Sequence, residues 1–310
     1  MRDEYWKIYY DEQTLERGNK QREEHGLFSA GVKIHIDVYA QPKPGAPVVV
    51  FNHGAAGYCR LFVNLALAFH DRGYTVVLPD QKGQGFSEGR RGDYTISECV
   101  RNIVDVCHWA RQRYEGPLFL AGGSVGGGLA YYAAAAGAKA NAAACLNLFD
   151  FGVGRDGLGI SRLAGLAKFP GAVRIARALA YLFQNSSRPG LPFGWAGAFE
   201  KLMDERDRDF QAKWDADPVP PRRVSPRSLA SALTTPPAVP FEKNRVPILV
   251  INQARDRMVD PEVTRRNFAR LSGPRELLEI PFGHWSAAPE FWDALVNACD
   301  NWFQRFPTGR

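Results

Sequence analysis

The sequence signal that decides the fold is a glycine-rich stretch, Leu118-Phe119-Leu120-Ala121-Gly122-Gly123-Ser124-Val125-Gly126-Gly127-Gly128-Leu129. It holds the pattern G-x-S-x-G at Gly122, Ser124 and Gly126, after an apolar run typical of a buried strand and before an alanine-rich run typical of a helix. A serine on so sharp a turn is forced into a strained backbone conformation, and its neighbours two positions away must be small. The stretch therefore predicts a nucleophile elbow, with a purely structural glycine turn as the alternative.

Short apolar runs alternate with helical patterns on both sides of this stretch. Thr95 and Glu98 form a capping box at the start of one of these helices. Strands are expected at residues 32–38, 48–51, 74–78, 118–121, 143–148, 248–251 and 277–280, and helices at 61–69, 96–107, 129–136, 262–271 and 291–303. Strands separated by helices predict an α/β fold, a mostly parallel central sheet with helices on both faces.

Residues 151–240 interrupt this alternation. They hold ten of the 21 prolines, with helical patterns and no convincing strand. An insertion between two strands of a parallel sheet lies at one end of that sheet, where such folds bind their ligands. We expect residues 1–150 and 241–310 to form the core and residues 151–240 a helical cap or lid; a separate domain on a linker is the alternative.

A general base and an acid for Ser124 follow two later strands. His284 comes directly after the strand at 277–280, and Asp256 directly after the strand at 248–251. The carboxyl ends of parallel strands meet at one edge of a sheet, which is also the edge that carries Ser124. The chain order Ser, Asp, His is the order expected of a triad on this kind of sheet.

Two other acids compete with Asp256. Asp260 is followed by Pro261, a pair typical of the start of a helix, which favours a capping role. Asp150 follows the strand at 143–148 and is the alternative acid. Asp256 is preferred on its place after a strand and on chain order, and Asp150 stays open.

An oxyanion needs two backbone donors near the nucleophile. The first is expected to be the N–H of Val125, the residue after Ser124. The second is expected from the loop His53-Gly54-Ala55-Ala56-Gly57, whose small residues allow close approach, and we choose the N–H of Ala55. His53 is interpreted as a residue that braces this loop rather than as a second base.

These residues together resemble the α/β-hydrolase superfamily. The likeness rests on His53-Gly54 after a strand, on the G-x-S-x-G at Ser124, on Asp256 and on Gly283-His284. It covers about residues 30–150 and 215–305. The resemblance implies a catalytic triad of Ser124, Asp256 and His284 and no cofactor.

Two stretches narrow the resemblance to the monoacylglycerol lipase and lysophospholipase-like (serine aminopeptidase S33-type) branch. Residues 80–89, DQKGQGFSEG, resemble the D-x-R-G-H-G-x-S-x-G loop of that branch, and residues 217–248 resemble its exit from the cap. Lys82 and Gln84 depart from the usual Arg and His, and Gln253 stands where a glycine is usual before the acid.

The resemblance implies a serine hydrolase that cleaves carboxylic esters of short to medium acyl chains, with monoacylglycerol and lysophospholipid as candidate substrates. Alternatives on the same triad are an acyltransferase and an S33-type peptidase or amidase. A peptidase of this kind would want acidic residues near the site to bind a substrate amine. A hydrolase-like binding protein without activity is disfavoured because all three triad residues are present.

Composition and charge limit the remaining possibilities for the location of the protein and for its partners. The 310 residues are 45% hydrophobic with a net charge of +6, and the five cysteines form no C-x-x-C cluster. We therefore expect a cytoplasmic globular protein with reduced, mostly buried thiols, no metal site and a small-molecule ester as its partner. No nucleic-acid-binding motif accompanies the basic charge, so no nucleic acid is expected to bind.

The positive charge gathers in the cap. Residues 151–240 hold 13 basic and eight acidic residues, and the part from 157 to 199 has five basic residues and no acidic one. In the expected helix from Pro170, Ile175, Leu179, Leu182 and Phe183 share one face, and Arg174, Arg177 and Tyr181 lie on another. Peripheral contact with an anionic membrane is one interpretation; the favoured one is that the apolar face packs on the core and the arginines are solvated.

Overall fold

The computed structural model describes residues 5–188, 190–204 and 207–307. Its strands are β1 (Arg22–Ser29), β2 (Val32–Tyr39), β3 (Val48–Asn52), β4 (Thr75–Pro79), β5 (Leu118–Gly123), β6 (Ala142–Leu146), β7 (Leu191–Pro192), β8 (Arg223–Val224), β9 (Ile248–Gln253) and β10 (Arg275–Ile280). Its α-helices are α1 (Glu12–Gln21), α2 (Val63–Asp71), α3 (Ile96–Arg111), α4 (Val125–Ala135), α5 (Arg155–Gly159), α6 (Pro170–Phe183), α7 (Phe193–Ala196), α8 (Arg208–Ala216), α9 (Pro226–Thr234), α10 (Pro261–Arg270) and α11 (Pro289–Phe303). The short 3-10 helix η3 (Ala164–Lys168) precedes α6.

Eight strands form one sheet in the order β1-β2-β4-β3-β5-β6-β9-β10. The neighbours from β4 to β10 run parallel, and β1 and β2 form an antiparallel extension at one side. The strands β3, β5, β9 and β10 therefore end at the same edge. The loops that follow them carry Ala55, Ser124, Asp256 and His284, so this edge gathers the residues that the sequence singles out.

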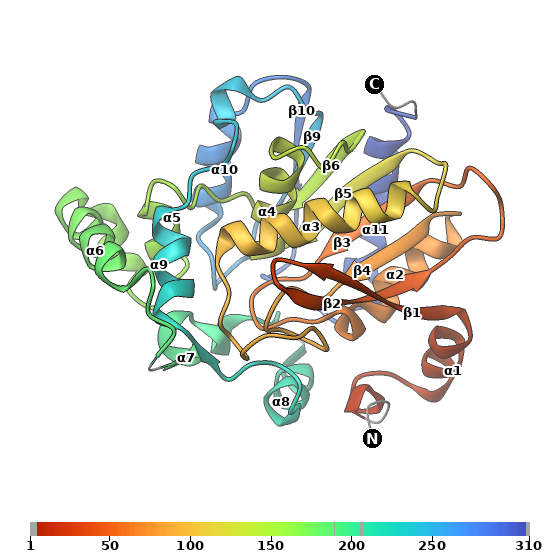
Figure 1. Ribbon diagram of the computed structural model, residues 1–310, viewed down its shortest axis with the longest axis horizontal. Coiled ribbons are helices and arrows are strands. Elements are labelled where there is room, and N and C mark those ends of the chain that lie inside the picture. Colours follow the sequence, from red (N-terminus) through yellow and green to blue (C-terminus); the bar gives the residue numbers. More distant parts are fainter. Residues whose placement is uncertain (1–4, 189, 205–206, 308–310) are drawn as a thin grey trace.

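Helices cover both faces of the sheet, as the alternating pattern predicts (Figure 1). Alternate residues of β3 point to opposite sides: Val49 and Phe51 join the apolar layer under α2 and α11, and Val48 and Val50 join the layer under α3, α4 and α10. The capping box at the start of α3 is present as predicted, with Thr95 and Glu98 each accepting from the other's backbone N–H. The predicted α/β fold is confirmed.

The five cysteines are all buried and none is in a disulfide. Burial raises the pKa of Cys107 and of Cys145 to about 12. The expected burial of the thiols is therefore confirmed, and they are held protonated.

Between β6 and β9 the chain forms α5 to α9 and a short pairing of β7 with β8. We call this segment the cap. The hydrophobic pattern of the sequence predicts no strand here, because β7 and β8 have only two residues each and so leave no periodic signal. None of the described helices is long and apolar enough to cross a membrane.

The outermost cap helix, α6, does not bury its apolar face on the core. It packs on α9, which lies between it and α3, and it stands at the left edge of the molecule in Figure 1. Ile175 is 65% exposed and Leu182 is 76% exposed. The expected packing of this face on the core is therefore wrong for Ile175 and Leu182, because the periodicity of a helix reveals an apolar face and does not say what covers it.

Candidate active site

Ser124 lies on the predicted sharp turn between β5 and α4. Its φ of 57° and ψ of −129° are a strained combination for a residue with a side chain. A Cβ added to Gly126 would lie 2.2 Å from the carbonyl oxygen of Asn52, and one added to Gly122 would lie 2.2 Å from the carbonyl oxygen of Gly126. Any larger residue at these two positions would clash with backbone, which explains the G-x-S-x-G pattern.

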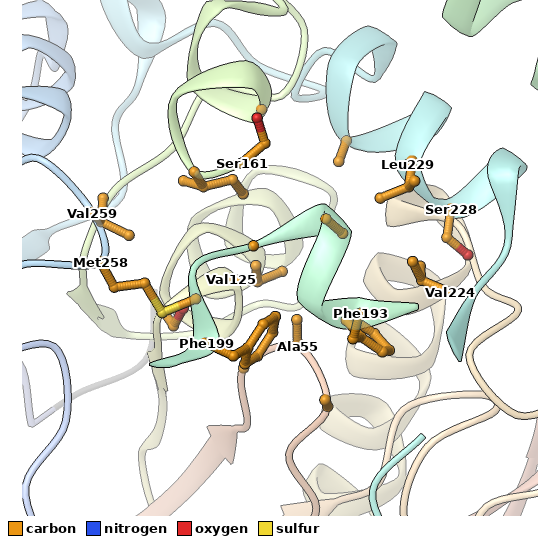
Figure 2. Close-up of a pocket in the computed structure, with 18 of the residues that line it drawn as sticks. Ala55, Val125, Ser161, Phe193, Phe199, Val224, Ser228, Leu229, Met258 and Val259 are labelled. Carbon is orange, nitrogen blue, oxygen red and sulfur yellow. The ribbon is translucent and has the colours of Figure 1, made fainter. Parts of the chain in front are cut away.

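The loop after β3 approaches Ser124 closely. A Cβ on Gly54 would lie 3.1 Å from Cβ and 3.5 Å from Oγ of Ser124. The next residue, Ala55, and the residue after Ser124, Val125, line the same cavity as Ser124 (Figure 2). Val125 is the first residue of α4, where backbone N–H groups lack partners within the helix. The two N–H groups chosen from the sequence thus belong to segments that flank Ser124.

His53 braces this loop. Its Nε2 accepts from the N–H of Gln81 at 3.1 Å, so its Nδ1 carries the proton and donates to the carbonyl of Gly54 at 2.8 Å. Burial lowers the pKa of His53, which keeps the ring neutral. Both ring nitrogens are engaged in holding the loop, which is the bracing arrangement expected from the sequence.

His284 and Asp256 lie in direct contact. The Nδ1 of His284 donates to Oδ2 of Asp256 at 2.7 Å, and both side chains are buried. The other carboxylate oxygen accepts from the N–H groups of Met258 and Val259 at 2.9 and 2.8 Å. Three hydrogen bonds fix the carboxylate, and it in turn fixes the orientation of the imidazole.

The second ring nitrogen of His284 is available. Nε2 is buried and has no hydrogen-bond partner among the described residues. His284 and Ser124 line the same cavity. A neutral imidazole with its proton on Nδ1 can accept a proton at Nε2, which is the role that a serine nucleophile requires of its base.

The two competing acids have other partners. Asp150 accepts from a guanidinium nitrogen of Arg270 at 2.8 Å and from the N–H of Gly152 at 3.0 Å. Asp260 accepts from the N–H of Glu262 at 3.0 Å and caps α10, as its sequence context predicts. Among the three acids, the structure brings Asp256 into contact with His284.

Two departures from the family pattern take part in holding the site. Gln253 donates to the carbonyl of His284 at 2.9 Å. Gln84 accepts from the N–H of Ala56 at 2.8 Å and so supports the residue next to Ala55. The sequence marks both positions as unusual, but which segments they contact follows only from the tertiary structure.

An apolar cavity of about 540 Å³ lies above Ser124, between the core loops and the cap. Figure 2 shows Val125 and Ala55 from the core together with Phe193, Phe199 and Leu229 from the cap around this space. No Asp, Glu, Lys or Arg is among the described residues that line it. The volume and the lining are typical of a site for a small apolar ligand.

Part of α6 forms an outer wall of the cavity. Three of the residues that line it are also at least half exposed to solvent: Leu163, Leu179 and Phe183, at 57%, 50% and 51%. Each of them therefore contacts the cavity with one part and solvent with another. Leu179 and Phe183 belong to the apolar face of α6, so this face is shared between the cavity and solvent.

Two groups of potential metal ligands occur in the described part of the chain, and both lie away from this cavity. One combines His35, Cys59 and Asp80, and the other combines Glu24, His35 and Asp37. Arg60 donates to Asp37 and Glu24, which both belong to the second group. Burial favours a raised pKa for Asp37, but the hydrogen bond from His35 and the charge of Arg60 outweigh it and lower that pKa. The guanidinium of Arg60 and the two carboxylates of the second group thus form an ion-pair cluster.

The chain matches the model of one protein family, described as serine aminopeptidase, S33, over residues 43–281. No curated protein sequence matches it. Solved structures with similar folds include the α/β hydrolase GrgF from Penicillium sp. sh18, with a TM-score of 0.69 and 17% identity, covering 92% of this chain and 99% of that one.

Two further similar structures carry names that describe an activity. A soluble variant of monoglyceride lipase from Saccharomyces cerevisiae has a TM-score of 0.68 and 19% identity, over 92% of this chain and 96% of that one. A carboxyl esterase from Bacillus coagulans has a TM-score of 0.68 and 16% identity, over 92% of this chain and 98% of that one. At these identities the likeness establishes a shared fold.

Proposed function

The chain belongs to the serine aminopeptidase S33 family and is a hydrolase of the α/β-hydrolase fold, and on this premise we propose that it cleaves carboxylic esters through an acyl-enzyme on Ser124. One observation carries the proposal. Ser124 and the hydrogen-bonded pair of His284 and Asp256 meet at the base of an apolar cavity. A hydroxyl nucleophile, an imidazole with a free Nε2 and an orienting carboxylate suit acyl transfer.

In the proposed reaction Ser124 Oγ attacks the ester carbonyl while Nε2 of His284 takes its proton. The N–H groups of Ala55 and Val125 stabilise the negative charge on the carbonyl oxygen. The alcohol leaves with the proton from His284, and the acyl group remains on Ser124. A water molecule, deprotonated by His284, then releases the acid and restores the serine. Asp256 holds the imidazole and stabilises its charged form throughout.

The cavity lining supports esters of apolar acids over peptides. An aminopeptidase binds the charged amine of its substrate, and a carboxylate in the site is the usual partner for that charge. The described lining residues include no carboxylate. Phe193, Phe199 and Leu229 instead offer an acyl chain an apolar surface. We propose acyl chains of short to medium length, with monoacylglycerol and lysophospholipid as candidate natural esters.

The proposal predicts that kcat/KM for p-nitrophenyl esters rises with the length of the acyl chain. Each methylene buried in the cavity contributes about 0.8 kcal/mol, which is about fourfold in kcat/KM until the chain reaches the mouth. A series from acetate to decanoate measures this slope. A fluorophosphonate that modifies serine should abolish the activity and label Ser124, as mass spectrometry of the digested protein can verify.

Three results of this series would each reject a part of the proposal. A flat slope contradicts acyl binding in the cavity. Activity that survives complete labelling of Ser124 contradicts the acyl-enzyme. Hydrolysis of aminoacyl p-nitroanilides but not of esters would favour the peptidase alternative.

We also propose that the exposed face of α6 contacts an anionic lipid surface, from which an apolar ester can reach the cavity. The side chains on this face that project into solvent include Ile175 and Leu182, and the same helix lines the cavity through Leu179 and Phe183. The segment from 157 to 199 is basic and has no acidic residue. A second copy of this chain would bring like charges together on this face, whereas anionic headgroups complement them.

Co-sedimentation with phosphatidylglycerol vesicles tests this surface. The double variant Ile175→Ser with Leu182→Ser should weaken binding at least about tenfold, because it removes two apolar side chains from the contact. Binding should also fall with added salt and be weak on phosphatidylcholine vesicles. Phe28→Ser is the matched control, since Phe28 is 73% exposed on β1, far from the cap in the fold. Equal binding by the double variant, or dimerisation of the wild type through α6, contradicts the proposal.

A further inference from the structure

The loop that carries His284 is hydrogen-bonded to the cap on both sides of the histidine. The N–H of Gly283 donates to the carboxylate of Asp204 at 3.1 Å, and the N–H of Trp285 donates to the carbonyl of Leu202 at 3.0 Å. The N–H of Asp204 donates back to the carbonyl of Trp285 at 2.7 Å. Met203 and Trp285 thus form a parallel β-bridge between the cap and the loop.

A second carboxylate continues this contact. Oδ2 of Asp207 accepts from Oγ of Ser286 at 2.6 Å and from the N–H of Ala287 at 3.1 Å. The N–H of Asp207 donates to the carbonyl of Asp204 at 2.9 Å, which joins the two aspartates. We call Leu202, Met203, Asp204 and Asp207 the clamp, and residues 283–287 the histidine loop.

The core holds the histidine loop as well: Nε1 of Trp292 donates to the carbonyl of Ala287 at 3.3 Å, and the ring of Trp285 packs against Phe62 and Phe291. Gln253 binds the carbonyl of His284, and Asp256 binds its Nδ1. In the described part of the chain, the N–H groups of Gly283, Trp285 and Ala287 donate to the clamp. A Cβ on Gly283 would lie 3.2 Å from Cα of Asp204, so the two segments are also in close steric contact. The position of the imidazole therefore depends on the cap as well as on the sheet.

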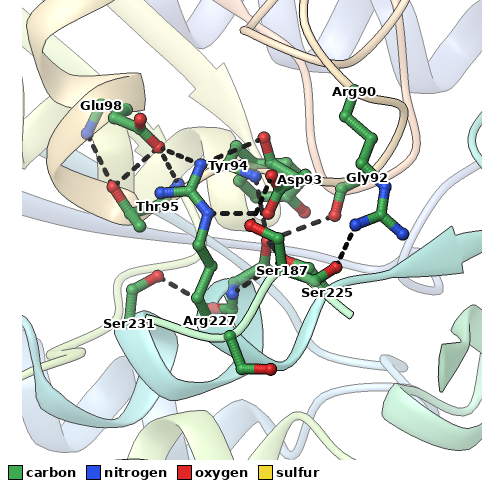
Figure 3. Close-up of polar contacts among 12 residues, drawn as sticks. Arg90, Gly92, Asp93, Tyr94, Thr95, Glu98, Ser187, Ser225, Arg227 and Ser231 are labelled. Atoms are coloured by element: carbon green, nitrogen blue, oxygen red, sulfur yellow. Dashed lines mark hydrogen bonds and ion pairs between the residues drawn. The ribbon is translucent and has the colours of Figure 1, made fainter. Parts of the chain in front are cut away.

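The cap is also anchored to the core at its opposite side. Arg227 of α9 forms ion pairs with Asp93 at 2.7 Å and with Glu98 at 3.0 Å, at the start of α3 (Figure 3). The hydroxyls of Ser228 and Ser231 accept from backbone N–H groups of the same segment. The cavity lies between this anchor and the clamp, because Ser228 and both Leu202 and Met203 line it.

We propose that Asp204 and Asp207 are positioning residues for His284: through them the cap holds the histidine loop where its imidazole can serve Ser124. The inference rests on the proposed function, since it assigns the base of that reaction its support. Displacement of a catalytic group by about 1 Å can cost about a hundredfold in rate. The cap then controls the chemistry as well as access to the cavity, because a cap that moves away releases both segments.

Alanine and asparagine variants test the clamp. Asp207→Ala and Asp204→Ala should lower kcat for p-nitrophenyl butyrate about 10- to 100-fold, with little change in KM, because the apolar cavity remains. Asp207→Asn should restore most of kcat, since its amide oxygen can still accept from Ser286 and Ala287. Asp209→Ala is the matched control: Asp209 is an exposed acid of the same cap segment, and no contact joins it to the histidine loop among those described.

A double-mutant cycle tests how much of the loss in kcat comes from the hydrogen bond between Ser286 and Asp207. Ser286→Ala removes the hydroxyl that donates a hydrogen bond to Asp207, and it should lower kcat several-fold. The combined variant should lose less than the product of the two single losses, because Asp207 and Ser286 share one hydrogen bond. Ser286→Ala also removes the acceptor of the N–H of Ala288, so a part of its effect should persist in the combined variant. If Asp207→Ala fails to fold, which thermal melting detects, Ser286→Ala and Asp207→Asn still test the contact from its two sides.

The hydrogen bond between His284 and Asp256 gives a readout that does not depend on activity. Its Nδ1 proton should give a downfield proton NMR resonance in the wild type and in Asp209→Ala, and that resonance should shift or broaden in Asp204→Ala and Asp207→Ala. Folded alanine variants with wild-type kcat and an unchanged resonance would overturn the inference. A wild-type protein that neither hydrolyses esters nor reacts with the phosphonate would reject the proposed function, while the resonance would still decide whether the clamp positions His284.

Discussion

Ser124→Ala is expected to lose about 10⁴- to 10⁶-fold in kcat for p-nitrophenyl esters and to react no longer with a fluorophosphonate. Without Oγ no acyl-enzyme can form, and the backbone donors of Ala55 and Val125 can support only slow attack by water. The protein should remain folded, because alanine keeps the backbone of the turn and no buried polar partner depends on the hydroxyl among the described residues. Purified wild type and variant are compared in ester hydrolysis and in thermal melting.

Ser97→Ala serves as the control for this change. Ser97 is an exposed residue of α3, so the Ser97→Ala variant loses a hydroxyl outside the site and should keep full activity. Ester hydrolysis by folded Ser124→Ala at the wild-type rate would exclude Ser124 as the nucleophile. A variant that melts far below the wild type would instead indicate that the turn needs the hydroxyl.

Asp256→Asn is expected to lower kcat by about 10⁴-fold with the fold retained. The asparagine oxygen can still accept from the N–H groups of Met258 and Val259, which preserves the loop. Its amide nitrogen would then face Nδ1 of His284 and require that atom to accept. The ring proton moves to Nε2, and the imidazole can no longer take the proton of Ser124.

Asp150→Asn is the matched variant, since it removes a charge from the competing acid. Asp150 is paired with Arg270, so its loss should lower the melting temperature and leave kcat close to that of the wild type. Steady-state kinetics on both variants decide between the acids. Loss of activity in Asp150→Asn with full activity in Asp256→Asn would reverse the assignment.

The parallel part of the sheet was predictable because its strands are buried on both faces and appear as continuous apolar runs. β1 was not predicted, because it is an edge strand whose residues are mostly polar and whose Phe28 faces solvent. The helix α1 before it is likewise polar, with Gly18 as its buried residue. Both elements depend on the neighbouring β2 and α2, which a local pattern does not reveal.

Topology explains how much of the candidate site the sequence could supply. Ser124, Asp256 and His284 each follow a strand, and parallel strands bring such residues to one edge whatever the details of packing. Asp204 and Asp207 appeared in the sequence only as part of the charge of the cap. They contact the histidine loop across about 80 positions of chain, with no spacing rule that links the two segments. Contacts of this kind become visible only when the cap is placed in three dimensions.

The placement of α6 has a consequence for how such a protein can diversify. This helix packs on α9, α5 and η3, all within the cap, whereas Ser124 and His284 lie on loops of the sheet. Substitutions on its outer face change no contact of the core, so they cost little stability. Natural variation and laboratory selection can therefore change the outer side chains of α6 while Ser124 and His284 keep their surroundings. The clamp segment is expected to have less freedom, since it is hydrogen-bonded to the loop that carries His284.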